Sequence, residues 1–183
     1  IPSSSYEFIR SLLKPQPYMV FCDKLRKDYT PAGFVSLVAE LFREMGADVT
    51  LGKAGPDEAI DLWLDTAEGD YIVQCKKWKE KKKVGVPTVR EVYGAAVKQQ
   101  AKGAFIVTVS SFTDKAVEFT IDRPPSTIRD REIRHILNGV EEPFNLINPP
   151  VGLIDGKELF YLMNQHMPTV VTDILEGRRK SHR

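Results

Sequence analysis

The sequence is poor in cysteine and has no long apolar run, and each scarcity excludes a class of protein. Its 183 residues contain two cysteines, Cys22 and Cys75, too few for a disulfide framework or a zinc-ligand cluster. No uncharged apolar stretch approaches the roughly 20 residues of a membrane helix, and no signal peptide is visible. The three histidines match no metal-ligand spacing. We therefore expect a cytoplasmic domain with a sizeable core and no membrane segment.

The formal net charge is only +1, so the distribution of charged residues along the chain is more informative than their sum. Residues 51–70 contain six acidic side chains and one lysine, whereas residues 71–102 contain nine basic side chains and two acids. An acidic segment that runs directly into a basic one suits a site that holds a cation beside a polyanion. The alternative is two solvated faces whose charges offset each other.

Hydrophobic periodicity predicts an α/β fold with a central mixed sheet flanked by helices. The clearest helix spans residues 30–46, with Thr30 as N-cap, Pro31 at the first position and Gly46 as the stop. We expect strands at 47–51, 60–65, 71–76, 103–109 and 151–155, and further helices at 88–102, 112–120 and 156–166. The predicted order is helix, three-stranded meander, helix, strand, helix, strand.

The remaining segments frame this domain. Residues 1–29 are expected to be an N-terminal extension, with a short helix at 6–13 and an irregular or extended connection at 14–21. The domain itself covers 30–176 and carries an insertion at about 122–150. Residues 177–183, GRRKSHR, are expected to form a basic disordered tail.

A polar constellation lies on the strand pair 60–65 and 71–76. Gln74 and Lys76 are two residues apart, so both side chains leave the same face of their strand. Asp61 is on the neighbouring strand, and the hairpin brings it close to them. An acid, an amide and an ammonium on one sheet face suit metal-assisted phosphodiester hydrolysis. The alternative is an exposed cross-strand Asp–Lys pair, because the D-x₁₂-Q-x-K pattern is weak by itself.

Each of these residues has a candidate role in such chemistry. Mg²⁺, or Mn²⁺ in its place, prefers oxygen ligands, and the candidates are the Asp61 carboxylate, the Gln74 amide oxygen and the Cys75 backbone carbonyl. Lys76 is the candidate to activate a water and to stabilise the transition state. Asp57 is an accessory candidate acting through water, with loop capping as the alternative. The Cys75 thiol points to the opposite face and is expected in the core.

A lysine-rich segment, KKWKEKKK, follows the second strand of the hairpin directly at residues 76–83. Lysine neutralises phosphate, and tryptophan stacks on bases or wedges into a groove. The alternative is a solvated loop with its tryptophan packed on neighbours. Thr108 and Ser110–Ser111, after the next strand, are expected to cap a helix in preference to touching phosphate. The candidate DNA-binding residues are Lys77, Trp78, Lys79, Lys81, Lys82 and Lys83.

Six sequence blocks between residues 30 and 159 follow an informative order. They are FVSLVAELFREMGADV, GPDEAID, YIVQCKKW, VGVPTVREVYGAA, KGAFIVTVSSFTDKA and GLIDGKEL. In this order they resemble the Mrr-type restriction endonuclease family, part of the PD-(D/E)XK nuclease superfamily. The resemblance implies a restriction-endonuclease-like fold, DNA as substrate and a divalent metal. It gives Asp61 the position of the metal-binding Asp, Gln74 that of the Gln/Glu and Lys76 that of the catalytic lysine.

Three features depart from the family pattern. Val35 stands where the family has a metal-binding Glu, and Glu40, five residues on, lies about 140° around the helix. Glu58-Ala59 replaces a usual glycine pair, and the insertion at 122–150 lengthens a short connection.

The expected function is therefore a Mg²⁺-dependent DNA endonuclease in the restriction of foreign or modified DNA. A homodimer is expected, because double-strand cutting by single active sites usually needs a pair. Two alternatives stay open: a catalytically weakened nuclease-fold DNA-binding module, and a protein-interaction domain in which the lysine run is only surface.

Overall fold

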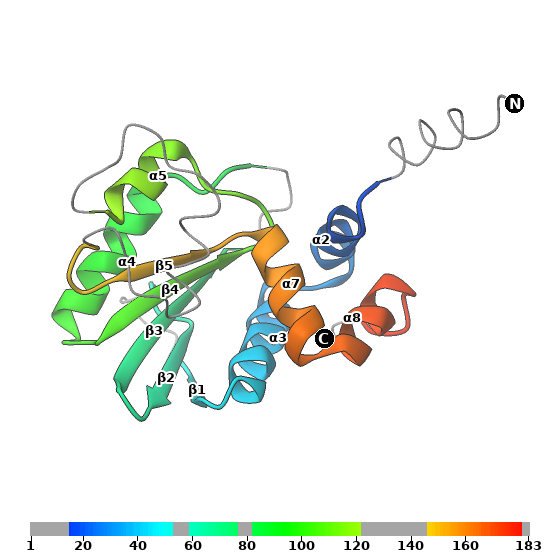
Figure 1. Ribbon diagram of the computed structural model, residues 1–183, viewed down its shortest axis with the longest axis horizontal. Coiled ribbons are helices and arrows are strands. Elements are labelled where there is room, and N and C mark those ends of the chain that lie inside the picture. The colour runs from blue at the N-terminus through cyan, green and yellow to red at the C-terminus, as the bar shows by residue number, and fades with distance from the viewer. Residues whose placement is uncertain (1–14, 53–58, 77–81, 122–145, 181–183) are drawn as a thin grey trace, which may run out of the picture.

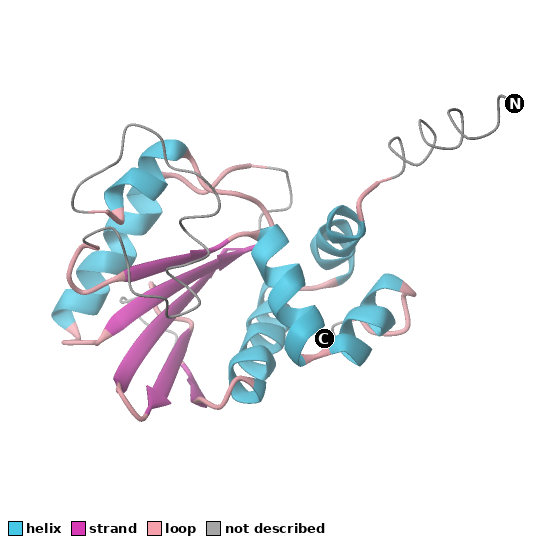
Figure 2. Ribbon diagram, viewed as in Figure 1, coloured by secondary structure: helices cyan, strands magenta, loops and turns pink. Residues whose placement is uncertain are grey.

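The computed structural model describes residues 15–52, 59–76, 82–121 and 146–180, which form a sheet between two layers of helices (Figures 1 and 2). The five strands lie in the order β1-β2-β3-β4-β5. The first three form an antiparallel meander, and β3–β4 and β4–β5 are parallel. The predicted α/β fold with a mixed sheet is confirmed. The strands are β1 (Asp48–Leu51), β2 (Leu62–Thr66), β3 (Gly69–Lys76), β4 (Gly103–Thr108) and β5 (Val151–Ile154).

The helices divide between the two faces of the sheet, as Figure 1 shows. Helices α4 (Val86–Lys98) and α5 (Asp114–Phe119) cover one face. Helices α3 (Pro31–Glu44) and α7 (Gly156–His166) cover the other face, and α2 (Pro17–Asp28) and α8 (Pro168–Leu175) pack against α7. None of the described helices is long and apolar enough to cross a membrane.

The helix starts follow from capping side chains in the sequence. Thr30 Oγ1 accepts a hydrogen bond from Gly33 N at 3.0 Å at the start of α3, as its position before Pro31 predicts. Asp155 caps α7 in the same way through Glu158 N at 2.8 Å. These caps fix where the two helices begin, and the spacing of their apolar residues decides which faces they bury.

The expected irregular connection at residues 14–21 was wrong from residue 17 onward. Pro17 stands at the first position of α2, where its missing N–H costs nothing, so the prolines begin a helix there. The buried face of α2 includes Phe21 and Leu25, and the Phe21 and Phe160 rings meet edge to face with centroids 5.4 Å apart. Helix α8 was also not predicted. The expected helix at 6–13 lies outside the described residues.

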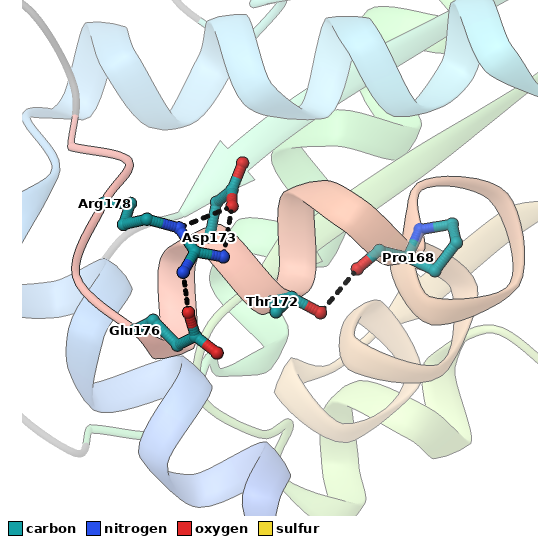
Figure 3. Close-up of polar contacts among 5 residues, drawn as sticks. All are labelled: Pro168, Thr172, Asp173, Glu176 and Arg178. Carbon is teal, nitrogen blue, oxygen red and sulfur yellow. Dashed lines mark hydrogen bonds and ion pairs between the residues drawn. The ribbon is translucent and has the colours of Figure 1, made fainter.

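The chain beyond α8 folds back over its last turn. Arg178 donates from Nε and Nη2 to Asp173 Oδ1 at 3.0 and 2.9 Å and also pairs with Glu176 (Figure 3). Figure 3 also shows Thr172 Oγ1 donating to the Pro168 carbonyl. The next residue, Arg179, reaches back to α3, so the first part of the expected basic tail makes specific contacts.

Candidate active site

Asp61 is held in place by three hydrogen bonds. It lies in the bend directly before β2, one residue short of the strand in which we expected it. Its N–H donates to the Val73 carbonyl at 2.8 Å, and its carbonyl accepts Gly52 N–H at 2.7 Å. Its carboxylate oxygen Oδ2 accepts the Cys75 N–H at 2.6 Å. The carboxylate is therefore fixed against the end of β3, the strand that carries Gln74 and Lys76.

The alternation of β3 sends Gln74 and Lys76 to the face of the sheet that α4 covers. Ile72, two residues before Gln74, is buried in the cluster that includes Val89 of α4. Gln74 is 6% exposed, and its Nε2 lies 3.5 Å from the Cys75 carbonyl oxygen. Lys76 is half-buried at the last position of the strand. A buried amide and a half-buried ammonium thus share one face, as their spacing predicts.

The Cys75 side chain lies on the opposite face. It is half-buried and packs against the core cluster around α3, which confirms the expectation that it is a core residue. Burial, and secondarily the nearby Asp61 carboxylate, raise the pKa of the Cys75 thiol well above its ordinary value. The thiol is consequently protonated near neutral pH and is a poor nucleophile.

Burial also dominates the electrostatics of Asp61. Desolvation raises the pKa of its carboxyl above the ordinary value, while the hydrogen bond from Cys75 N–H and the charge of Lys76 lower it. The net effect is a raised pKa, which means that the protein alone does not fully compensate the ionised carboxylate. A cation beside Asp61 would favour the ionised form.

The sheet face that we predicted for Ile60, the residue before Asp61, was wrong. We expected Ile60 on the same face as Leu62 and Leu64. The two leucines are buried in the cluster on the α3 side, but Ile60 is buried in the cluster on the α4 side. Strict alternation fails because residue 60 precedes the bend at Asp61, where the chain is not yet extended.

A second carboxylate from α3 is engaged elsewhere. Val35, where the resemblance led us to expect a Glu, packs against the apolar core. Glu40 Oε2 accepts a hydrogen bond from Arg179 Nη2 at 2.5 Å. Among the residues that the structure describes, no three His, Cys, Asp or Glu side chains gather into a metal-binding group. Asp57, the accessory candidate, lies outside these residues.

Of the lysine-rich segment 76–83, the structure describes Lys76, Lys82 and Lys83. Lys82 and Lys83 are exposed, while Lys77, Trp78, Lys79 and Lys81 lie outside the described residues. Beyond them the chain is fixed to the segment after β4, because Val84 N donates to Ser111 O at 2.8 Å.

Thr108 and Ser110 do not cap a helix as we expected. Thr113 caps α5, accepting Ala116 N–H at 3.2 Å. Thr108 Oγ1 instead donates to the Lys76 carbonyl at 2.7 Å, and Ser110 Oγ donates to the Lys82 carbonyl at 2.7 Å. Both contacts depend on the parallel pairing of β3 with β4, which no local sequence signal reveals.

Comparison with known proteins places this arrangement in a family. No curated protein sequence matches the chain. The DNA modification-dependent restriction endonuclease AspBHI shares its fold, with a TM-score of 0.54 and 16% identity over 92% of this chain; the chain spans 41% of that protein. The MspJI restriction endonuclease, solved in complex with a 27-mer oligonucleotide, aligns with a TM-score of 0.43 and 18% identity over 80% of this chain and 31% of that one.

The sequence match extends over the site itself. The Mrr_cat family model, which describes a restriction endonuclease, matches residues 26–137, more than half of the chain. This range includes Asp61, Gln74 and Lys76, and it confirms the resemblance found in the sequence blocks. The chain therefore belongs to the restriction endonuclease family of the Mrr_cat model.

Proposed function

We propose that the chain is a Mg²⁺-dependent DNA endonuclease whose active site is formed by Asp61, Gln74 and Lys76. The observation that carries the proposal is the 2.6 Å hydrogen bond from Cys75 N to Asp61 Oδ2. It holds a carboxylate beside the strand that presents a buried amide and an ammonium. Membership of a restriction endonuclease family makes phosphodiester hydrolysis the chemistry that fits this set.

The oxygen atoms near Asp61 suit a hard divalent cation. The proposed ligands are the Asp61 carboxylate, the Gln74 amide oxygen and the Cys75 backbone carbonyl, which lies 3.5 Å from the Gln74 amide nitrogen. The raised pKa of Asp61 supports this assignment, because burial leaves its negative charge incompletely compensated. A bound Mg²⁺ or Mn²⁺ would supply charge neutralisation at the scissile phosphate and activation of a water.

Lys76 is the proposed catalytic lysine. Its charge already acts on Asp61, since it lowers the pKa of that carboxyl. Its half-buried ammonium would hold the attacking water by hydrogen bonding and stabilise negative charge that develops on the phosphate oxygens.

The lysine-rich segment is the proposed DNA contact. Exposed Lys82 and Lys83 follow the catalytic strand closely and would neutralise backbone phosphates. We extend the same role to Lys77, Lys79 and Lys81, with Trp78 stacking on a base, and an accessory role to Asp57. The full proposal is a cytoplasmic enzyme, acting as a homodimer in the restriction of foreign or modified DNA. The likeness to AspBHI supports this biological role.

A second function, a DNA-binding module with weakened catalysis, is favoured by one observation. Glu40 of α3 pairs with Arg179, and Val35 is apolar, so neither of these positions supplies a second metal ligand. Mg²⁺ is usually held through one or two carboxylates, and Asp61 is the one placed at this site in the described part of the chain.

Nicking of supercoiled plasmid with Mg²⁺ or Mn²⁺ separates the two functions. We expect the wild type to nick and Lys76→Ala to lose nicking. Lys102→Ala is the matched control, because Lys102 is exposed and precedes β4 at the opposite end of the sheet from Lys76. Cleavage that survives in Lys76→Ala at the wild-type rate would refute the site.

DNA binding at varied salt resolves the outcome in which the wild type does not nick. Salt-sensitive binding without cleavage would support the DNA-binding module. Absence of DNA binding even at low salt would refute both nucleic-acid functions, and the remaining alternative would be a protein-interaction domain.

A further inference from the structure

The end of the catalytic strand is held by a buried hydroxyl. Lys76 is the last residue of β3, and its partner in the parallel ladder is Thr108, the last residue of β4. Thr108 is completely buried, and its Oγ1 donates to the Lys76 carbonyl at 2.7 Å. A buried hydroxyl without a partner would be costly, and valine would fill the same volume without that cost. The hydroxyl at this position therefore serves the hydrogen bond and not the packing.

A second hydroxyl holds the chain where it returns from the lysine-rich segment. Ser110 Oγ donates to the Lys82 carbonyl at 2.7 Å, and Val84 N donates to Ser111 O at 2.8 Å. The two hydroxyl contacts are themselves connected, because Ser110 N donates to Thr108 Oγ1 at 3.1 Å. The backbone at residues 76 and 82 is thus tied to one short segment after β4.

We propose that Thr108 and Ser110 are positioning residues for the active site, Thr108 for the catalytic Lys76 and Ser110 for the DNA-binding Lys82. Neither side chain touches substrate in this assignment. Each orients the backbone from which a functional lysine projects. The inference rests on the proposed nuclease function and adds to it two residues that the catalytic pattern does not contain.

The two residues should affect different steps of the reaction. Displacing the carbonyl of Lys76 turns the side chain that acts in the transition state, and a misplacement of about 1 Å costs on the order of 100-fold in rate. Displacing the carbonyl of Lys82 moves a phosphate contact that is the same in the ground and transition states. Loss of such uniform binding raises KM and leaves kcat unchanged.

Steady-state nicking kinetics of four variants test this division. Thr108→Val, which keeps the shape and removes the hydroxyl, should lower kcat by about 10- to 100-fold with little change in KM. Thr108→Ser, which keeps the hydroxyl, should restore most of the lost kcat. Ser110→Ala should raise KM by about tenfold at unchanged kcat, the size expected for one charged backbone contact. Ser111→Ala is the control and should match the wild type, because only the backbone of Ser111 takes part in these contacts.

Equal kinetics for Thr108→Val and the wild type would overturn the role of Thr108. A loss in Thr108→Val that Thr108→Ser does not rescue would show a packing role and overturn it as well. Wild-type KM in Ser110→Ala would overturn the role of Ser110. If Thr108→Val fails to fold, Thr108→Ala replaces it in the same comparison with Thr108→Ser, and Ser110→Ala tests the role of Ser110 independently.

Amide hydrogen exchange separates this inference from the nuclease function. If the wild type does not cleave, the proposed function fails, but the effect of the two hydroxyl hydrogen bonds on the backbone can still be measured. Ser110 N–H should exchange faster in Thr108→Val, and Val84 N–H should exchange faster in Ser110→Ala than in Ser111→Ala. Unchanged exchange at both amides would overturn the inference whatever the activity.

Discussion

Substitution of Gly52 should strongly affect the active site, although glycine carries no functional group. Its N–H donates to the Asp61 carbonyl at 2.7 Å, so it contacts the backbone from which the proposed metal ligand projects. A methyl carbon built on Gly52 would overlap the Ile60 carbonyl oxygen and lie 3.1 Å from the Asp61 carbonyl oxygen. The atoms in the way are backbone, so rotation of a side chain cannot relieve the clash.

Gly52→Ala should therefore push the bend at Asp61 away from β1. Overpacking of this kind costs about 1–3 kcal/mol of the free energy of unfolding. A shift of the carboxylate on the order of 1 Å should lower nicking about 100-fold. Both effects are measured on the same preparation, by denaturant unfolding and by plasmid nicking.

Gly94→Ala is the matched control for this substitution. Gly94 lies in α4 and is exposed, and a methyl carbon added to it would meet no described atom within 4 Å outside its own helix backbone. Alanine there should stabilise the helix by about 0.5–1 kcal/mol and leave nicking unchanged. Wild-type nicking in Gly52→Ala would refute the reasoning that backbone contact at Gly52 sets the position of Asp61.

Three further predictions concern the rest of the molecule. Glu40→Gln should leave nicking unchanged and cost at most about 1 kcal/mol, because Glu40 pairs with Arg179 at a partly exposed site; lost cleavage would place Glu40 in the active site after all. Cys22, whose pKa burial raises to about 12, and Cys75, whose pKa is also raised, should both resist iodoacetamide in the folded protein, and rapid alkylation at a pH of about 8 would contradict these raised pKa values. Leu37→Ala should cost about 2–5 kcal/mol in urea unfolding, and a smaller loss would mean that the α3 core repacks.

Local sequence signals predicted the sheet and most of its helices correctly. The alternation in β3 placed Gln74 and Lys76 on one face, and Thr30 with Pro31 placed the start of α3. These features depend on neighbours in the sequence, through the period of a strand or a cap and its helix. The candidate site was therefore accessible from the sequence wherever its residues share one strand.

The features that the sequence did not reveal depend on contacts between distant segments. Thr108 and Ser110 bond to carbonyl groups 32 and 28 residues away, and Glu40 meets an arginine 139 residues away. The sheet face on which Ile60 lies depends on the bend at Asp61, and the alternation of apolar and polar residues does not predict that bend. We expected residues 14–21 to be irregular or extended, whereas Pro17 begins helix α2 there.

The raised pKa of Asp61 predicts how the stability of the protein changes when the charge of this side chain is removed. Its pKa is raised in the folded state, so the stability contributed by the protonated carboxyl is present below the ordinary pKa and is lost as the pH rises through the folded pKa. Asparagine is neutral at every pH and keeps an oxygen to accept the Cys75 N–H. Asp61→Asn should therefore be at least as stable as the wild type at neutral pH.

Plasmid nicking by Asp61→Asn in Mg²⁺, with its melting temperature measured alongside, tests the central claim most directly. The account predicts that nicking disappears while the melting temperature stays at or above that of the wild type, because the substitution removes a proposed metal ligand and not a structural contact. Nicking at the wild-type rate by the folded Asp61→Asn protein would contradict the assignment of the active site.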